Sequence, residues 1–242
     1  MMKAVVIEKA GGPEALQLKE VPTPQVKPGW TLIQVKGFGI NHSEIYTRKG
    51  ESPDVKFPRI LGIECVGVIA DTSDPDQLPV GQKVASFMGG MGRDFDGSYA
   101  EYTLLPNNQI YPVETNLSWA DFAAIPETFF TAYGSLRNAR VETADSLLIR
   151  GGTSGVGVAA MKLAKAMHPG IRVSGSTRSP KKFDLMREAG CDNPLEDRDD
   201  QLQTDEKFQA IVELVGTKTL VNSLGHMERG GFCCLTGGLG DA

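Results

Sequence analysis

The chain has 242 residues, 40% of them hydrophobic and 23% charged, so it can bury a sizeable core in one large domain or in two smaller ones. Its net charge of -5, from 25 basic and 30 acidic residues, argues against a nucleic-acid partner, which usually needs a basic face. No apolar run approaches the roughly 20 residues that span a bilayer, and charges come too early for a secretory signal, so we expect a cytoplasmic protein without a membrane partner.

The first part of the chain, residues 1–117, is predicted to form β-structure. Short runs rich in Val and Ile alternate with turn residues such as Gly11-Gly12-Pro13 and Pro28-Gly29. Closely spaced short strands with such turns indicate a barrel or a sandwich. The expected strands are residues 2–8, 16–21, 31–38, 62–70, 83–88 and 98–105.

The pattern changes near residue 117, and residues 118–242 are predicted to form a second domain. Ser118 and Asp121 resemble a capping box, although Asp stands where Glu or Gln is usual. Ser179-Pro180 provides an N-cap and a first position for a helix that Gly190 can end. Expected strands at 146–150, 171–175, 193–196 (weak), 210–215 and 231–236 alternate with helices, including one at about 156–167. This β-α-β-α order predicts a doubly wound parallel sheet.

A glycine-rich loop follows the strand at 146–150. Aligned to G-x-G-x-x-G, Gly152 takes the first place, Ser154 the second and Gly157 the third, with Gly155 as an extra glycine. The first glycine permits a tight turn, the next small residue lets a pyrophosphate approach, and the last lets the helix pack closely. With a strand before it and a helix after it, the loop predicts dinucleotide binding by residues 152–157, that is Gly152, Thr153, Ser154, Gly155, Val156 and Gly157.

A purely structural β-α turn is the alternative for this loop. A second glycine-rich stretch, residues 88–92, shows the contrast, because no apolar helix follows it. We expect that stretch to be a flexible loop of the first domain.

The residues after the second strand favour NADPH over NADH. An NAD enzyme usually places an acid there, about 20 residues past the loop, to bind the ribose hydroxyls. This chain has Ser176, Thr177 and Arg178 instead, with Lys182 just beyond. Arg178 and the nearby lysines, with no acid beside them, suit a 2′-phosphate. The alternative is that Lys181 and Lys182 are solvated charges on a helix face.

Several blocks of sequence resemble the medium-chain dehydrogenase/reductase superfamily, in its quinone oxidoreductase-like branch. They are residues 39–50, 58–69, 96–102 and 131–134, together with the glycine loop, so the resemblance runs along nearly the whole chain. It implies an N-terminal GroES-like β-barrel domain joined to a Rossmann domain, with the active site in the cleft between them. It also implies a small-molecule substrate.

The resemblance implies no metal site. Zinc-dependent relatives have Cys and His where this chain has Asn41 and Ile63. His42 and Glu64 remain, but they do not make a set of three protein ligands. The four-cysteine zinc cluster of such relatives is absent too. We expect the four cysteines of this chain, which form no CxxC pair, to be reduced thiols packed as small apolar residues.

The resemblance also implies roles for three residues. Tyr46 lies near the nicotinamide and the substrate, Asn41 shapes the site, and Thr131 contacts the cofactor. The implied reaction is zinc-free hydride transfer from NADPH to a quinone or to the β-carbon of an enone, with a proton from Tyr46 or water. A packing residue in the barrel is the alternative for Tyr46.

Only five strands can be placed in the second domain, whereas a complete Rossmann sheet has six. We therefore expect a sheet truncated before its sixth strand, which is the usual dimer edge, with a last strand open to pairing and reduced stability. A homodimer is left open. The rival interpretations are a non-catalytic NADPH-binding redox sensor or interaction protein, and a folded fragment that holds no cofactor.

Overall fold

The computed structural model describes residues 1–240, so Asp241 and Ala242, the end of the predicted second domain, lie outside it. The chain forms two compact units, Met1–Glu127 and Thr128–Ala242. Each unit has its own hydrophobic core, one between antiparallel strands and the other around a mostly parallel sheet. None of the described helices is long and apolar enough to cross a membrane.

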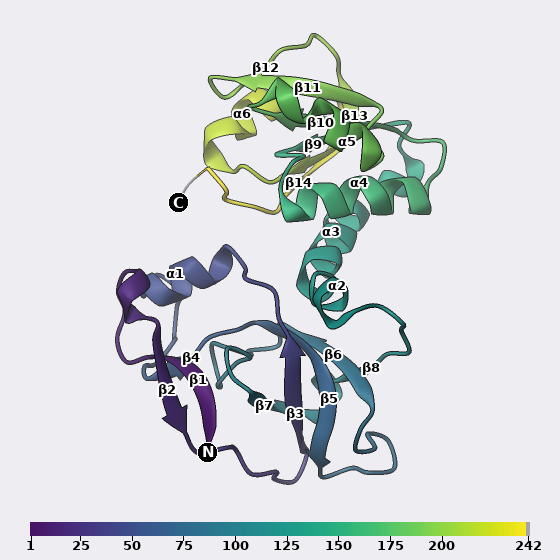
Figure 1. Cartoon of the computed structure of the whole chain (residues 1–242). Helices are drawn as coiled ribbons and strands as arrows, with labels where there is room; N and C mark the ends of the chain where they lie inside the picture. The colour runs from purple at the N-terminus through teal and green to yellow at the C-terminus, as the bar shows by residue number, and fades with distance from the viewer. Residues whose placement is uncertain (241–242) are drawn as a thin grey trace. The chain divides into compact units, whose positions relative to one another are not determined.

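The first unit contains two antiparallel sheets (Figure 1). A three-stranded sheet has the order β2-β1-β4, and a five-stranded sheet has the order β7-β3-β5-β6-β8. The strands are β1 (Met2–Ile7), β2 (Gln17–Val21), β3 (Trp30–Gly37), β4 (Arg59–Ile60), β5 (Glu64–Thr72), β6 (Lys83–Phe87), β7 (Tyr102–Pro106) and β8 (Tyr111–Pro112). All six strands expected from the sequence are present, with ends shifted by a few residues.

The core of the first unit comes from the alternation of apolar residues along its longer strands. Ile33 of β3, Cys65 and Ile69 of β5, Val84 of β6 and Leu105 of β7 are all buried in one cluster. The second glycine-rich stretch forms a loop between β6 and β7, as expected. One short helix, α1 (Ser43–Lys49), lies between β3 and β4 and ends at Gly50 in a left-handed conformation.

Helix α2 (Trp119–Ala123) belongs to the first unit, although the sequence pattern changes before it. Its Phe122 and Ala123 are buried against Val66 and Ala85, so the compact unit extends to Glu127. Ser118 caps the helix, because its hydroxyl accepts a hydrogen bond from the Asp121 amide. The Asp121 carboxylate accepts from the Ser118 hydroxyl rather than from a backbone N–H, since Asp is shorter than Glu.

The second unit is built on one sheet with the order β12-β11-β10-β9-β13-β14 (Figure 1). All its neighbouring strands are parallel except the β11–β12 pair. The strands are β9 (Ser146–Arg150), β10 (Arg172–Thr177), β11 (Asn193–Arg198), β12 (Gln201–Leu202), β13 (Phe208–Glu213) and β14 (Met227–Leu235). Apart from β12, the order matches positions 3-2-1-4-5 of a doubly wound sheet, which confirms the predicted fold class.

Alternate residues of the central strands face opposite sides of this sheet. Leu147 and Ile149 of β9 pack in one cluster with residues of α3 (Pro126–Asn138), α4 (Gly155–Met167) and α5 (Phe183–Glu188). Leu148 packs in a second cluster on the other side with Phe208 and Ile211. Helix α6 (Thr217–Gly225) contacts β12, β13 and β14. Helices are therefore divided between the two faces, as a doubly wound sheet requires.

Two local predictions differ from the structure. The weak third strand extends to Arg198, and β12 turns back beside it in a hairpin that the sequence did not indicate. The Ser179 side chain makes no capping hydrogen bond, because a short 3₁₀ helix, Pro180–Lys182, comes before α5. Gly190 does follow the helix with a positive φ of 103°.

Strand β14 pairs with β13 alone in the described sheet. Its Cys233 and Cys234 face opposite sides, one in each core cluster, and all four cysteines are free thiols. Phe232 and Leu235 are partly exposed along this edge. Association through β14 and reduced stability stay predictions.

Shortening a central side chain tests the core of the second unit. Leu148 is fully buried, so Leu148→Ala should lower the free energy of unfolding by about 2–5 kcal/mol. Leu185→Ala on α5 is the matched control, because this Leu is 63% exposed and should change stability by no more than about 0.5 kcal/mol. Urea unfolding measures both variants. Equal losses would contradict the assigned core.

Candidate active site

The glycine loop joins β9 to α4 and is bonded to the end of β10. The Gly151 N–H donates to Ser176 Oγ at 3.1 Å, and the Gly152 N–H donates to the Ser176 carbonyl at 2.9 Å. Gly151 has a φ of 80°, whereas Gly152 has no positive φ. The turn that the motif alignment assigned to Gly152 is therefore made by Gly151, which the predicted site left out.

Gly152 and Gly157 are needed for close packing. A Cβ at Gly157 would lie 2.6 Å from the Gly151 carbonyl oxygen, and a Cβ at Gly152 would lie 2.6 Å from the Met161 side chain. Ser154 caps α4, since its hydroxyl accepts from the Gly157 N–H at 3.0 Å. Because Gly152 and Gly157 have no side chains, the start of α4 and its free N–H groups can lie close to the end of β9.

A cavity of about 640 Å³ opens beside this loop, entirely within the second unit. Five predicted cofactor residues line it: Thr153, Ser154, Ser176, Thr177 and Arg178. Its volume is in the range of small-molecule and cofactor sites. A backbone that only glycine permits, next to a helix N-terminus and a cavity, fits the phosphates of a dinucleotide.

The other predicted cofactor residues do not line this cavity. Gly152 packs closely on the Met161 side chain. The first turn of α4 contains Gly155, Val156 and Gly157, and Val156 packs on the core. Lys182 is exposed on the 3₁₀ helix, and Thr131 lies on α3, where its carbonyl accepts from the Ser135 hydroxyl. Their predicted contacts with the cofactor stay predictions.

Seven lining residues were not predicted: Gly151, Asp197, Asp200, Val215, Lys218, Leu239 and Gly240. Most follow or end β11 and β13. Ligands of open α/β sheets bind at the carboxyl ends of strands, so that rule could have identified them from the strand assignments. The glycine pattern alone covered only one strand end.

In the first unit, Asn41 and Glu44 stand at the start of α1 and connect three segments. The Asn41 amide Nδ2 donates to Glu64 Oε1 at 2.8 Å. The Glu44 carboxylate accepts from the N–H groups of Asn41 and Ile63 and from the Tyr99 hydroxyl at 2.6 Å. Both carboxylates are almost completely buried. These bonds fix the Asn41 side chain in one orientation.

Burial sets the protonation behaviour of this pair. Removal from water raises the pKa of Glu44, against the opposing effect of the hydrogen bonds from Tyr99, Asn41 and Ile63, and the nearby Glu64 raises it further. Burial also raises the pKa of Glu64, while the Asn41 amide and the Glu127 N–H act in the other direction. The pKa of the Tyr99 hydroxyl is strongly raised, first by burial and then by Glu44.

Tyr46 lies one turn further along α1, beside His42. The two rings are 5.7 Å apart, centre to centre, at an angle of 71°. Nε2 of His42 is buried and accepts or donates no hydrogen bond within residues 1–240. This end of α1 therefore presents a tyrosine and an unsatisfied imidazole nitrogen, which a polar ligand or water can complete.

The donor set at this position does not fit zinc. Asn41 and Ile63 supply no thiolate or imidazole, and the Glu64 oxygens are engaged by Asn41 and by the Glu127 N–H at 2.9 Å. Among the described residues, no three His, Cys, Asp or Glu side chains are grouped closely enough to hold a metal ion. A zinc site normally needs at least three such ligands.

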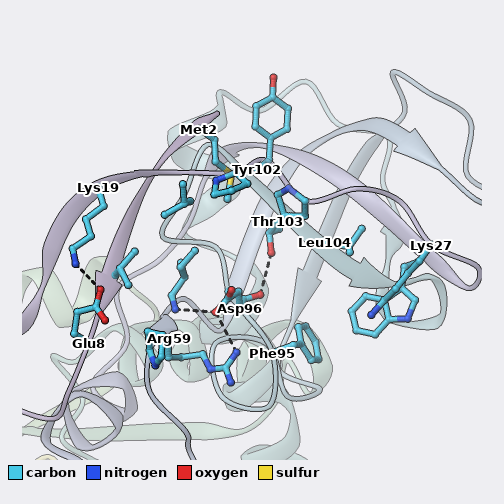
Figure 2. A pocket seen from close by; sticks show the side chains of 18 residues that line it. Met2, Glu8, Lys19, Lys27, Arg59, Phe95, Asp96, Tyr102, Thr103 and Leu104 are labelled. Carbon is cyan, nitrogen blue, oxygen red and sulfur yellow. Dashed lines mark hydrogen bonds and ion pairs between the residues drawn. The ribbon is translucent and has the colours of Figure 1, made fainter.

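A second cavity, of about 450 Å³, lies in the first unit and contains none of the predicted site residues (Figure 2). Its apolar walls include Met2, Phe95 and Leu104, as Figure 2 shows. Of the charged side chains around it, Lys19 pairs with Glu8 at 2.5 Å and Arg59 with Asp96 at 3.1 Å, and the Lys27 ammonium lies 4.0 Å from the centre of the Trp30 ring. Because none of the predicted site residues lines this cavity, it is not the candidate active site.

Comparison with known proteins agrees with this arrangement. The family model "Alcohol dehydrogenase GroES-like domain" matches residues 27–115, and the model "Zinc-binding dehydrogenase" matches residues 155–242. The quinone oxidoreductase of Rattus norvegicus is 30% identical over 250 residues, which cover 98% of this chain and 73% of the relative. The acryloyl-coenzyme A reductase of Metallosphaera sedula is 25% identical, covering 95% of this chain and 75% of the relative.

A solved structure of the quinone oxidoreductase from Coxiella burnetii has a TM-score of 0.86 and 27% sequence identity, covering 95% of this chain and 74% of that one. The fold and these relatives define an oxidoreductase of a pyridine-nucleotide-dependent dehydrogenase family. The chain belongs to the medium-chain dehydrogenase/reductase superfamily, and the predicted resemblance and its GroES-like and Rossmann folds are confirmed.

The same substitution should have different effects at a glycine of the loop and at a glycine away from the cavity. Gly157→Ala forces a Cβ against the loop backbone, and overpacking of about 1–3 kcal/mol should weaken nucleotide binding about tenfold. Gly225→Ala at the end of α6 is the matched control, because its Cβ would meet nothing within 4 Å and this glycine does not line the cavity. Calorimetric titration measures both. Equal weakening would show that the close approach at Gly157 does not shape the site.

The buried carboxylates predict a pH dependence of stability. Because the folded-state pKa values of Glu44 and Glu64 exceed the ordinary 4.5, the native state binds more protons than the unfolded state above that pH. Stability should therefore fall as pH rises from about 4.5 through the raised pKa values. Glu44→Gln should reduce this slope, whereas Glu51→Gln, on an exposed position, controls for net charge. A slope unchanged by Glu44→Gln would contradict the assignment.

Proposed function

We propose that this oxidoreductase transfers a hydride from NADPH to a quinone or an α,β-unsaturated carbonyl without zinc. The observation that carries the proposal is the glycine-loop cavity, with Arg178 in its wall and no acid between Ser176 and Ser179. A guanidinium can pair with a 2′-phosphate, while a ribose-binding acid would repel it. NADPH, when bound, supplies the hydride.

The residues of the second unit would hold and orient the nucleotide. The N–H groups at the start of α4 would bind the pyrophosphate, and Thr153 and Ser154, which line the cavity, would lie beside it. Arg178 follows β10, at the position expected for the adenosine ribose. Thr131 is proposed as a further contact because of the family resemblance, and Lys182 because it adds a cation just beyond Arg178.

The residues of the first unit would act on the substrate. We assign proton donation to the Tyr46 hydroxyl or to water, and positioning to Asn41, whose amide is held by Glu64. The free Nε2 of His42 offers one more polar contact to a bound carbonyl oxygen. Such preorganised donors can stabilise developing negative charge where zinc ligands are replaced by Asn41 and Ile63.

The names of the relatives support the substrate class. Quinones and acryloyl-coenzyme A, the acceptors named for two relatives, both carry a carbon–carbon double bond conjugated to a carbonyl.

A cytoplasmic location agrees with the four free cysteines. Burial raises the pKa of the Cys65 thiol to about 12, so this thiol resists oxidation.

Turnover tests this function. NADPH oxidation should occur with members of a panel of quinones, enones and aldehydes, and Tyr46→Phe should lower kcat at least about tenfold if its hydroxyl donates the proton. Tyr111→Phe, a partly exposed tyrosine on β8, is the matched control and should keep the wild-type kcat. Binding of NADPH without oxidation by any acceptor would favour the non-catalytic alternative, a redox sensor or interaction protein.

A further inference from the structure

A fully buried arginine stands directly before the glycine loop. Arg150 is the last residue of β9, and its side chain has no exposed surface. It is the largest of the fully buried side chains in the described part of the chain. Burying a charge in a core position costs free energy unless it is paired and hydrogen-bonded, so this residue needs a specific explanation.

Every N–H direction of the Arg150 guanidinium has an acceptor. Nε and Nη2 donate to the two carboxylate oxygens of Asp197, at 2.7 and 3.1 Å. Nη2 also donates to the Asp200 carbonyl at 2.9 Å, and Nη1 donates to Asn222 Oδ1 and Ser223 Oγ on α6. A two-bond contact between Arg and a carboxylate fixes direction as well as distance.

Two of the partners of Arg150 lie in the wall of the proposed cofactor cavity. Asp197 and Asp200 line that cavity together with Arg178. Asp199 and Asp200 both have left-handed backbones, with φ of 50° and 61°. Such conformations are costly for residues other than glycine and persist where neighbouring contacts hold them. Arg150 provides such a contact through the Asp200 carbonyl.

We propose that Arg150 determines the preference for a nucleotide with a 2′-phosphate, NADPH, over NADH. It does so by neutralising Asp197 and by holding the Asp197–Asp200 turn in the wall of the cavity. The inference rests on the proposed use of NADPH. An unpaired Asp197 carboxylate would repel the dianionic 2′-phosphate that Arg178 attracts. Paired with Arg150, Asp197 adds no net negative charge to this wall, in which the exposed Asp200 carboxylate also lies.

The test compares the affinities of NADPH and NADH in variants of opposite charge. Arg150→Met exposes the Asp197 charge, so the NADPH-to-NADH affinity ratio should fall about tenfold, the size expected from one unit charge in a partly solvated cavity. Asp197→Asn keeps an oxygen that accepts from Arg150 but leaves the positive charge of Arg150 without a carboxylate partner, so the NADPH-to-NADH affinity ratio should rise. The double variant should return toward the wild-type ratio. Calorimetry with each nucleotide measures all three.

Arg172→Met is the matched control, since this exposed arginine pairs with Glu206 and does not line the cavity. A purely structural role would weaken both nucleotides alike and leave the ratio unchanged in every variant, which would overturn the inference. Asp197→Asn decides the question even where Arg150→Met does not fold. Failure of the wild-type chain to prefer NADPH would overturn the proposed cofactor and this inference together, whereas a preference that no variant shifts overturns the inference alone.

Discussion

The second unit depends on one close approach, between the carbonyl of Gly151 and the backbone of Gly157. Any side chain at position 157 would collide with the loop, so α4 could not begin so near the end of β9. From this contact follow the direction of the helix N-terminus, the space for a pyrophosphate and the position of the cavity. The bonds from Gly151 and Gly152 to Ser176 then fix the same loop to the neighbouring strand.

A buried polar layer lies beneath that loop and joins the strand ends to α6. Arg150 and Glu213 are register partners on adjacent strands, and both are fully buried. Ser223 connects them, since its hydroxyl donates to Glu213 Oε2 and accepts from Arg150. Glu213 also accepts from the N–H groups of Val215 and Gly216. Fully satisfied networks of this kind are rigid, so Arg150 and Glu213 hold the lining residues Asp197 and Val215 in place.

Regular sequence patterns predicted the parallel sheet and the position of the glycine loop, but they did not identify the residues whose roles depend on tertiary contacts. The alternation of elements gave the sheet, and the glycine spacing located the loop, because both follow from backbone geometry. The tight turn was placed one residue late, at Gly152 instead of Gly151, since adjacent glycines leave the register open. Asp197 and Asp200 were missed because a two-residue left-handed turn after a weak strand has no clear signal, and Arg150 because its partners are distant in sequence.

The most direct test of this account is a calorimetric titration of the chain with NADPH and with NADH. If the glycine-loop cavity is a cofactor site with a phosphate-binding wall, NADPH should bind one molecule per chain and more tightly than NADH. Heat from neither nucleotide would contradict the central claim, because the loop geometry would then be structural only.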